Sequence, residues 1–265
     1  MKRSSDWQLR IYHEAQMHEK NCWLTLTYAK LDHGPSLKKR HLQLFLKRLR
    51  NYLRPLKFRY FGVGEYGTKS QRPHYHCILF GYDFPDKIHW RTTRAGHECY
   101  RSPLLEKIWT FGHSEIGALT PQSAGYTAQY VTKKVTGLAL NQVDPDTGLK
   151  PLEAIDLENG ELGRLEQEFA IMSRRPGLGA TWFEKYYQDC FPDDFVVIDG
   201  AKRAVPDYYR QLLEKKDPQM AETLKRKRRE KARIRAKDIS PLRLEQMDEH
   251  AQITNKARKL IGATF

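Results

Sequence analysis

Two histidines separated by one residue stand at the head of an apolar run, and this pattern constrains the fold more than any other feature. The run spans residues 72–80 and is rich in aromatic and aliphatic residues, which is typical of a β-strand. Side chains at positions i and i+2 of a strand project from the same face of the sheet. His74 and His76 are therefore predicted to point together, with Ile78 continuing their face toward the interior.

A glutamate one hairpin away completes a set of three metal ligands. Residues 58–66 predict the preceding strand and residues 67–71 the loop, which returns Glu65 beside His74. Two imidazoles and a carboxylate are a common ligand set for a divalent ion. The alternative, in which His74 and His76 form a buried structural pair, remains open at this point.

The composition favours a nucleic-acid partner. The 265 residues are 40% hydrophobic, which is enough for a core, and carry a net charge of +14 with a pI near 9.6. We expect a polyanionic partner other than a membrane, because no apolar run approaches the roughly 20 residues of a spanning helix. The four cysteines contain no C-x-x-C pair and residues 1–6 lead into no signal-like segment, so free thiols in a reducing cytosol are expected.

The remaining elements up to residue 117 follow from the spacing of apolar residues. They are a helix over 6–20, a strand over 22–28, a long amphipathic helix capped by Ser36, a loop over 82–102, a short helix over 104–109 and an edge strand within 112–117. Three further histidines, His89, His97 and His113, lack matching spacing and are interpreted as structural or surface residues.

A second group of reactive side chains lies in a predicted helix over residues 123–134, which follows Pro121. Tyr126 and Tyr130 are four residues apart and share a helix face, with Lys133 one turn further on. Packing into a core is the commoner role of such tyrosines. Beside a metal site, however, the same pair can act on a phosphodiester.

The chemistry requires both groups of residues. A phenol has a pKa near 10, so it attacks phosphorus only when a neighbouring cation stabilises the phenolate and a metal ion polarises the phosphate. The product is a 5′-phosphotyrosine and a free 3′-OH, and the linkage keeps the energy of the broken diester for a later rejoining step. Two tyrosines on one face allow two successive strand transfers.

Four motifs in this order resemble those of the HUH endonuclease superfamily, specifically the replication initiation proteins of gokushovirus-type microviruses. The motifs are Leu24-Thr25-Leu26-Thr27-Tyr28, Gly64-Glu65-Tyr66-Gly67, Arg72-Pro73-His74-Tyr75-His76 and Tyr126-x-x-x-Tyr130-x-x-Lys133-Lys134. The resemblance covers residues 20–135 well and residues 173–179 more weakly.

The resemblance implies an α+β, ferredoxin-like fold with a central antiparallel sheet flanked by helices. It implies a single-stranded DNA endonuclease and ligase that nicks the viral strand at the origin of a supercoiled circular duplex to initiate and terminate rolling-circle replication. The reaction would take place in the cytoplasm of the bacterial host, with a host helicase and DNA polymerase as partners.

The resemblance also assigns roles to residues. Tyr126, Tyr130 and Lys133 match the catalytic positions, His74 and His76 match the motif histidines, and Glu65 stands where single-tyrosine relatives place an acidic third ligand. Catalysis on phosphate favours Mg²⁺ or Mn²⁺, although the ligand set would equally suit Zn²⁺ or Fe²⁺.

The second half is predicted to extend this domain. We divide the chain into a nuclease core over 1–140, a loop-rich completion over 141–210 and a basic helical extension over 211–265, with a small hairpin within 195–205. A long helix begins near residue 217, and residues 225–237 contain nine Lys or Arg against one Glu, which is typical of a phosphate-binding surface. The residues expected to contact DNA are Arg72, Lys134, Lys225, Arg226, Lys227, Arg228 and Arg229.

Two alternatives remain. A non-catalytic binder of single-stranded nucleic acid would use the aromatic residues and the basic helix alone. A transposase with the same two-tyrosine chemistry would use the same residues on different DNA ends. The oligomeric state is not indicated by the sequence.

Overall fold

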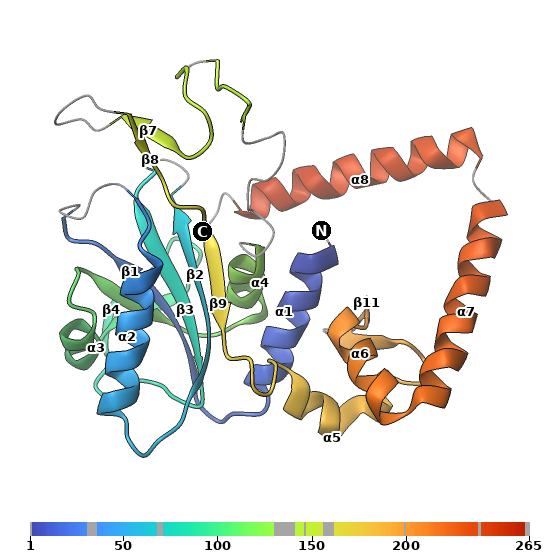
Figure 1. Ribbon diagram of the computed structural model, residues 1–265, viewed down its shortest axis with the longest axis horizontal. Helices are drawn as coiled ribbons and strands as arrows, with labels where there is room; N and C mark the ends of the chain where they lie inside the picture. The colour runs from blue at the N-terminus through green and yellow to red at the C-terminus, as the bar shows by residue number, and fades with distance from the viewer. Residues whose placement is uncertain are drawn as a thin grey trace. The chain divides into compact units, whose positions relative to one another are not determined.

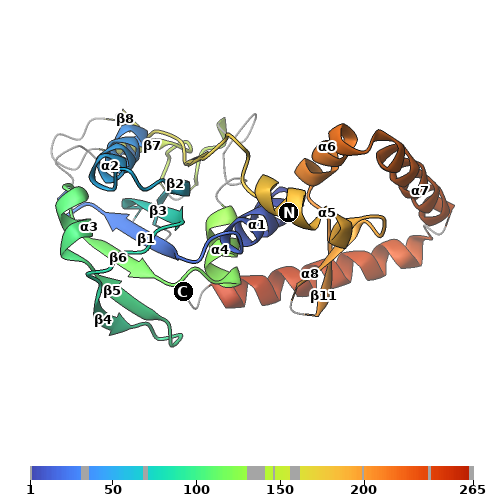
Figure 2. The same cartoon turned by 90° about the horizontal axis from the view of Figure 1, so that it is seen from below.

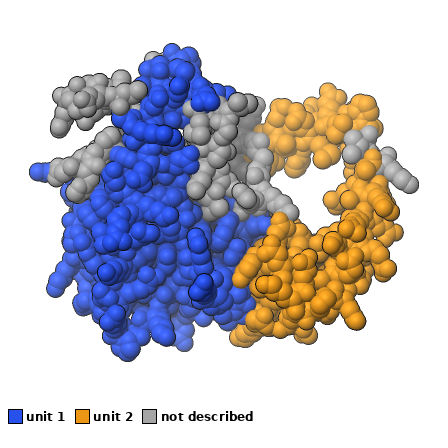
Figure 3. All heavy atoms as spheres, viewed as in Figure 1, with its two compact units in different colours: residues 1–91, 98–182 blue, residues 92–97, 183–265 orange. Residues whose placement is uncertain are grey.

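The computed structural model describes residues 2–30, 36–67, 71–129, 141–145, 147–155, 162–198, 200–237 and 240–262 (Figure 1). The chain divides into two compact units, coloured separately in Figure 3. Unit 1 comprises residues 1–91 and 98–182, and unit 2 comprises residues 92–97 and 183–265. Within the described ranges, no helix combines the length and the apolar character that crossing a membrane requires.

Unit 1 is built on a seven-stranded sheet. The strand order is β4-β5-β6-β1-β3-β2-β9, and β1 pairs antiparallel with β3 and β6, as does β2 with β3 and β9. The strands are β1 (Asn21–Thr27), β2 (Arg59–Tyr66), β3 (Pro73–Phe80), β4 (Ile88–Thr92), β5 (Glu98–Arg101), β6 (Ser114–Gly117) and β9 (Phe169–Met172). This sheet and its flanking helices confirm the predicted α+β class.

Helices cover both faces of the sheet. On one face α2 (Lys39–Tyr52) and α3 (Pro103–Ile108) pack on a core that includes Tyr75, Cys77 and Leu79. On the other face α1 (Lys2–Ala15) and α4 (Pro121–Gln129) enclose a second core that includes Ile78. The alternation predicted along β3 is therefore confirmed, and Figure 2 shows the helix pairs on opposite sides of the strands.

The helix predicted to be capped by Ser36 begins later. Its N-cap is Lys38, an extended residue that makes no side-chain capping bond. The Ser36 hydroxyl instead accepts a hydrogen bond from the backbone N–H of Glu166 at 2.8 Å, which ties it to the segment before β9. The capping prediction was wrong because a long-range bond takes the hydroxyl that the local pattern assigned to the helix.

Two predictions around the sheet edge were also wrong. The predicted loop over residues 82–102 contains β4 and β5, and the predicted edge strand β6 lies between β5 and β1. All five residues of β4 are exposed. A strand without a buried face lacks the apolar alternation that identifies strands in a sequence, which explains both errors.

Residues 141–182 add short elements to unit 1. The stretch predicted as long loops contains β7 (Glu153–Ile155) and β8 (Leu162–Arg164), which pair as a small hairpin. Helix α5 (Ala180–Cys190) follows and begins at the end of this unit.

Unit 2 is mainly helical. It contains β10 (Phe195–Ile198), β11 (Ala201–Ala204), α6 (Asp207–Lys216), α7 (Pro218–Lys237) and α8 (Pro241–Gly262). Phe183, Phe191 and Tyr209 contact one another through their rings in its core. The hairpin and the long basic helix that the sequence predicts are confirmed as β10–β11 and α7.

Candidate active site

The pairing of β2 with β3 assembles the candidate site. Glu65 lies directly opposite His74, as predicted, and Val63 lies opposite His76. The Nε2 atoms of both histidines are 2.7 Å from the same oxygen, Glu65 Oε1. Glu65 is 1% exposed and His76 is 4% exposed, whereas the His74 side chain is 17% exposed. The cluster therefore opens to solvent on the His74 side.

Contacts behind each ring fix which nitrogen faces the glutamate. His74 Nδ1 lies 3.1 Å from the Arg72 carbonyl oxygen, which can only accept, so Nδ1 carries the proton. His76 Nδ1 is 3.2 Å from the Thr25 hydroxyl. Trp23 stacks on the His76 ring with centroids 4.7 Å apart and an interplanar angle of 11°. Both Nε2 atoms are thus presented to the centre of the cluster, as a metal ligand pair requires.

The donor set fits a divalent cation. Glu65 Oε2 and His76 Nε2 are buried and have no hydrogen-bond partner. Buried polar atoms are almost always partnered in folded proteins. One ligand atom from each of Glu65, His74 and His76 lies within 4.8 Å of the others. A cation held by these atoms would satisfy both orphaned groups and leave further coordination positions for a substrate.

The electrostatics of the cluster are coupled. Burial tends to raise the pKa of Glu65, but the hydrogen bonds and charges of the two histidines outweigh it and hold that pKa at about 2. Burial tends to lower the pKa of His74, but hydrogen bonding to Glu65 outweighs it and raises that pKa. The pKa of His76 is lowered because burial dominates there. Glu65 is therefore an ionised carboxylate across the neutral range.

Tyr126 reaches this carboxylate from α4. Its hydroxyl donates a hydrogen bond to Glu65 Oε1 at 3.1 Å, and its ring packs edge-on against His76 with centroids 5.3 Å apart. Burial, together with the charge and hydrogen bond of Glu65, raises the pKa of Tyr126. A phenolic hydroxyl thus lies within hydrogen-bonding distance of the candidate metal ligands.

Local contacts explain the position of α4. Thr120 and Ser123 cap the first turn reciprocally: the backbone N–H of Ser123 donates to Thr120 Oγ1 at 3.1 Å, and that of Thr120 donates to Ser123 Oγ at 2.9 Å. Gln8 of α1 donates to the Pro121 carbonyl at 3.1 Å. Ala124 and Ala128 are buried in the core on this face of the sheet. Tyr126 lies between these two alanines on the same helix.

The other predicted site residues fall into two groups. Tyr130, Lys133 and Lys134 lie outside the described residues. Arg72 is described, and its guanidinium donates to the carbonyl oxygens of Tyr28 and Ala29 at 2.6 and 3.0 Å.

Sequence reasoning missed the residues that support the site. Thr25 and Trp23 contact His76, and Trp23 Nε1 donates to Thr127 on α4 at 3.0 Å, which links β1 to the tyrosine helix. The alternation of residues 22–27 placed Trp23 and Thr25 on one face. Only the strand order of the folded sheet showed that this face adjoins His76.

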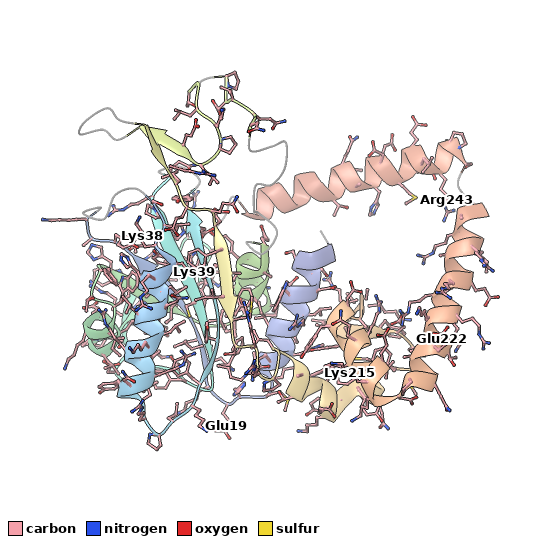
Figure 4. All side chains as sticks on the ribbon, in the orientation of Figure 1. Glu19, Lys38, Lys39, Lys215, Glu222 and Arg243 are labelled. Carbon is pink, nitrogen blue, oxygen red and sulfur yellow. The ribbon has the colours of Figure 1, made fainter. Side chains whose placement is uncertain are left out.

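The predicted basic surface lies on α7. Its side chains project from the helix in Figure 4, where Glu222 is labelled near the start of α7. Lys225, Arg226, Lys227 and Arg229 are exposed, whereas Arg228 is half-buried and lies 2.9 Å from Asp194. Four of the five basic residues named from the sequence are therefore accessible to a partner.

Fold and site together define a class of protein. A central antiparallel sheet with flanking helices, a His-x-His pair on an inner strand and an adjacent tyrosine helix constitute an HUH nuclease-like fold. The family model described as replication-associated protein ORF2 matches residues 21–135, which include β1 to β6 and α4.

Relatives from phages match over longer stretches. Replication-associated protein VP4 of Bdellovibrio phage phiMH2K is 30% identical over 264 residues, covering 93% of this chain and 74% of that protein. Replication-associated protein ORF2 of Spiroplasma virus 4 is 30% identical over 227 residues, covering 80% and 64% respectively. Replication-associated protein ORF4 of Chlamydia phage 1 is 30% identical over 223 residues, covering 81% and 51%. The chain belongs to the family of phage replication-associated proteins.

This membership confirms the resemblance to microvirus-type rolling-circle replication initiators. The chain spans less than two thirds of the length of the Spiroplasma and Chlamydia phage relatives. No solved structure matches the chain.

Proposed function

We propose that the protein is a site-specific nicking and joining endonuclease, which opens the viral DNA strand at the replication origin and later reseals it. The observation that carries this proposal is the Tyr126 hydroxyl, 3.1 Å from the carboxylate that both motif histidines contact. Membership of the replication-associated family supports a role in rolling-circle replication. The structure adds a candidate nucleophile beside a candidate metal site.

Glu65, His74 and His76 would hold a divalent ion, for which we propose Mg²⁺ or Mn²⁺. Such an ion supplies charge stabilisation to a non-bridging phosphate oxygen. The three side chains leave one side of the cluster open, at the half-buried His74. A phosphate of single-stranded DNA is expected to enter there.

Tyr126 is the nucleophile in this proposal. Its oxygen attacks phosphorus and forms a phosphotyrosine bond to the 5′ side, while the P–O3′ bond breaks and the released 3′ oxygen takes up a proton. The phenol must first lose its proton and its hydrogen bond to Glu65, and we assign stabilisation of the phenolate to Lys133. Rejoining runs this sequence in reverse with a 3′-OH as the attacking group, so no nucleotide cofactor is needed.

Tyr130 is proposed as the second nucleophile. It stands one helical turn after Tyr126 in the sequence. Two phenols in turn would let the enzyme accept a new strand while releasing the previous one. The unit-length circle would then be closed without the protein leaving the DNA.

The parts outside the sheet would serve the same reaction. We propose that Arg72, Lys134 and the exposed basic residues of α7 contact phosphates, and that residues 1–140, 141–210 and 211–265 act as nuclease core, completion and DNA-binding extension. The substrates are a supercoiled circular duplex origin and the single strand displaced from it. A host helicase and polymerase in the bacterial cytoplasm would continue from the free 3′-OH.

The test is the formation of a covalent adduct. The protein is mixed with Mn²⁺ and single-stranded oligonucleotides tiled across the viral strand, and a denaturant-resistant protein–DNA band is sought. We expect an adduct with one origin-derived sequence, its loss in the Tyr126→Phe, Tyr130→Phe double variant, and unchanged noncovalent DNA binding by that variant. Phe keeps the ring packing of Tyr126 against His76 and removes only the hydroxyl.

The outcomes separate this proposal from its rival. Equal adduct in the double variant would remove both tyrosines from the mechanism. DNA binding without an adduct on any viral-strand sequence would favour a non-catalytic binder, a function that the exposed basic residues of α7 otherwise also allow.

A further inference from the structure

The sheet edge farthest from β9 carries an exposed tryptophan. Trp90 lies on β4, and 55% of its surface is exposed. The guanidinium carbon of Arg101, on the neighbouring strand β5, lies 4.9 Å from the centroid of the Trp90 ring. This cation–π contact orients the indole while leaving much of the ring open to solvent.

The strand register places Arg101 on the same face of the sheet as the candidate site. Tyr100 packs into the core under α2 and α3, so the adjacent Arg101 projects from the opposite face. On that opposite face Glu115 of β6 lies opposite Thr25 of β1, which in turn lies opposite His76 of β3. Directly opposed residues share a face, so the row runs from the metal cluster toward the exposed edge.

This row is long enough for a strand of DNA. Neighbouring strands are about 4.8 Å apart, so the four steps from β3 through β1, β6 and β5 to β4 span about 19 Å, the length of a few nucleotides. In Figure 2 the strands β6, β5 and β4 continue the sheet beyond the part that α1 and α4 cover. The row is therefore continuous with the candidate site and open along its outer half.

The charges along the row suit a polyanion. Residues 87–101 contain four Lys or Arg against one Glu. That acid, Glu98, is in contact with His89, and Glu115 accepts two hydrogen bonds of 2.9 Å from the guanidinium of Arg91. Both carboxylates are thus engaged by basic side chains and repel phosphates less than free acids would.

We propose that Trp90 is a stacking platform for one base of the single-stranded DNA that extends from the phosphate held at Glu65, His74 and His76. Arg101 braces the indole, and the adjoining basic side chains attract the backbone. This inference rests on the proposed function, because the strand that enters the candidate site is its ligand. Stacking tolerates every base, so Trp90 strengthens the grip on unpaired DNA without reading sequence.

Binding to single strands and to duplexes tests the platform. Affinities are measured by fluorescence anisotropy with a labelled mixed-sequence oligonucleotide, single-stranded or annealed to its complement, in EDTA so that no nicking occurs. We expect Trp90→Ala to weaken single-strand binding about tenfold, Trp90→Phe to retain most of the affinity, and duplex binding to stay unchanged. Ile88→Ala, on the same strand and 65% exposed, is the matched control and should bind like the wild type.

The outcomes distinguish the platform from the nuclease proposal. Wild-type affinity in a folded Trp90→Ala protein would overturn the platform, as would an equal loss in Ile88→Ala, which would point to general damage to the hairpin. If the wild type forms no covalent adduct but Trp90→Ala still weakens single-strand binding, the platform stands and the nicking proposal fails. If the adduct forms and Trp90→Ala binds normally, the platform alone fails.

Discussion

At the scale of single residues, Glu65 is the point at which the site is most sensitive. Its Oε1 is in contact with His74, His76 and Tyr126, whereas its Oε2 has no hydrogen-bond partner. A carboxylate that is 1% exposed and half unsatisfied is costly for the folded protein. The chain keeps an arrangement that is unfavourable for stability, which is typical of a binding position.

We expect Glu65→Gln to abolish tight Mn²⁺ binding. The amide removes the negative charge and one strong oxygen ligand, so the melting temperature of the wild type should rise with Mn²⁺ while that of the variant should not. Glu184→Gln is the control, because Glu184 is an exposed carboxylate paired with Lys216. Differential scanning fluorimetry and isothermal titration calorimetry provide the measurement, and equal Mn²⁺ stabilisation of the wild type and Glu65→Gln would remove Glu65 from the ligand set.

His13 is expected to make the folded state sensitive to acid. It is 2% exposed and stacks on Trp182 with centroids 3.6 Å apart, and burial lowers the pKa of His13 to about 3. The unfolded chain, with a pKa near 6.5, binds the proton more tightly, so stability is highest above pH 6.5 and falls as the pH drops from 6.5 toward 3. At pH 5 the loss from this residue is about 2 kcal/mol.

Urea denaturation between pH 4.5 and 8 measures this effect. The His13→Phe variant keeps a flat ring against Trp182 but cannot take up a proton. The difference between its free energy of unfolding and that of the wild type should vary with pH as described. A constant difference would show that His13 does not titrate between the two states.

At the scale of elements, the packing of β9 against β2 leaves no room beside Gly64. A Cβ built at Gly64 would lie 2.7 and 2.9 Å from two ring atoms of Phe169, which lies opposite it on β9. Because Gly64 immediately precedes Glu65, the tight contact also sets the position of the carboxylate. This contact joins the end of unit 1 to the strand that carries the site.

We expect Gly64→Ala to lower the free energy of unfolding by about 1–3 kcal/mol, the usual cost of overpacking. The cost should be smaller in a Phe169→Ala background, where the clash is absent. Chemical denaturation of the two single variants, the double variant and the wild type gives this coupling. Additive effects would show that the Phe169 ring moves aside freely.

The sequence predicts the centre of the sheet better than its margins. The register of Glu65 and His74 follows from a short hairpin between two apolar runs, so local pattern and tertiary structure agree. β4 was missed because its exposed residues show no buried face, and the Ser36 cap was misassigned because Glu166 takes its hydroxyl. The contact of Tyr126 with Glu65 joins residues 61 positions apart, and only folding reveals such a distance.

At the scale of the whole molecule, the charge is concentrated on one element. Of the net +14, a local +8 falls within residues 225–237 of α7. This concentration separates chemistry from electrostatic attraction: the candidate site lies in unit 1 and the densest positive charge lies in unit 2.

Neutralising α7 should change the salt dependence of DNA binding. In a variant with Lys225, Arg226, Lys227 and Arg229 replaced by Gln, we expect the slope of log K against log[salt] for single-stranded DNA to fall by about 3, roughly 0.7 for each phosphate that is no longer neutralised. Arg228 is left in place because it pairs with Asp194. The control exchanges Lys and Arg at the same four positions and preserves the charge; an unchanged slope in the Gln variant would exclude α7 from the DNA interface.

The order in which the site is assembled along the chain has a consequence for safety inside a cell. Glu65, His74 and His76 come together through one local hairpin, whereas Tyr126 arrives only when α4 docks on the finished sheet. A newly made or partly unfolded polypeptide can capture an ion, but its phenol has no defined seat beside that ion. On this view, the capacity to damage DNA is withheld until maturation of the chain is complete.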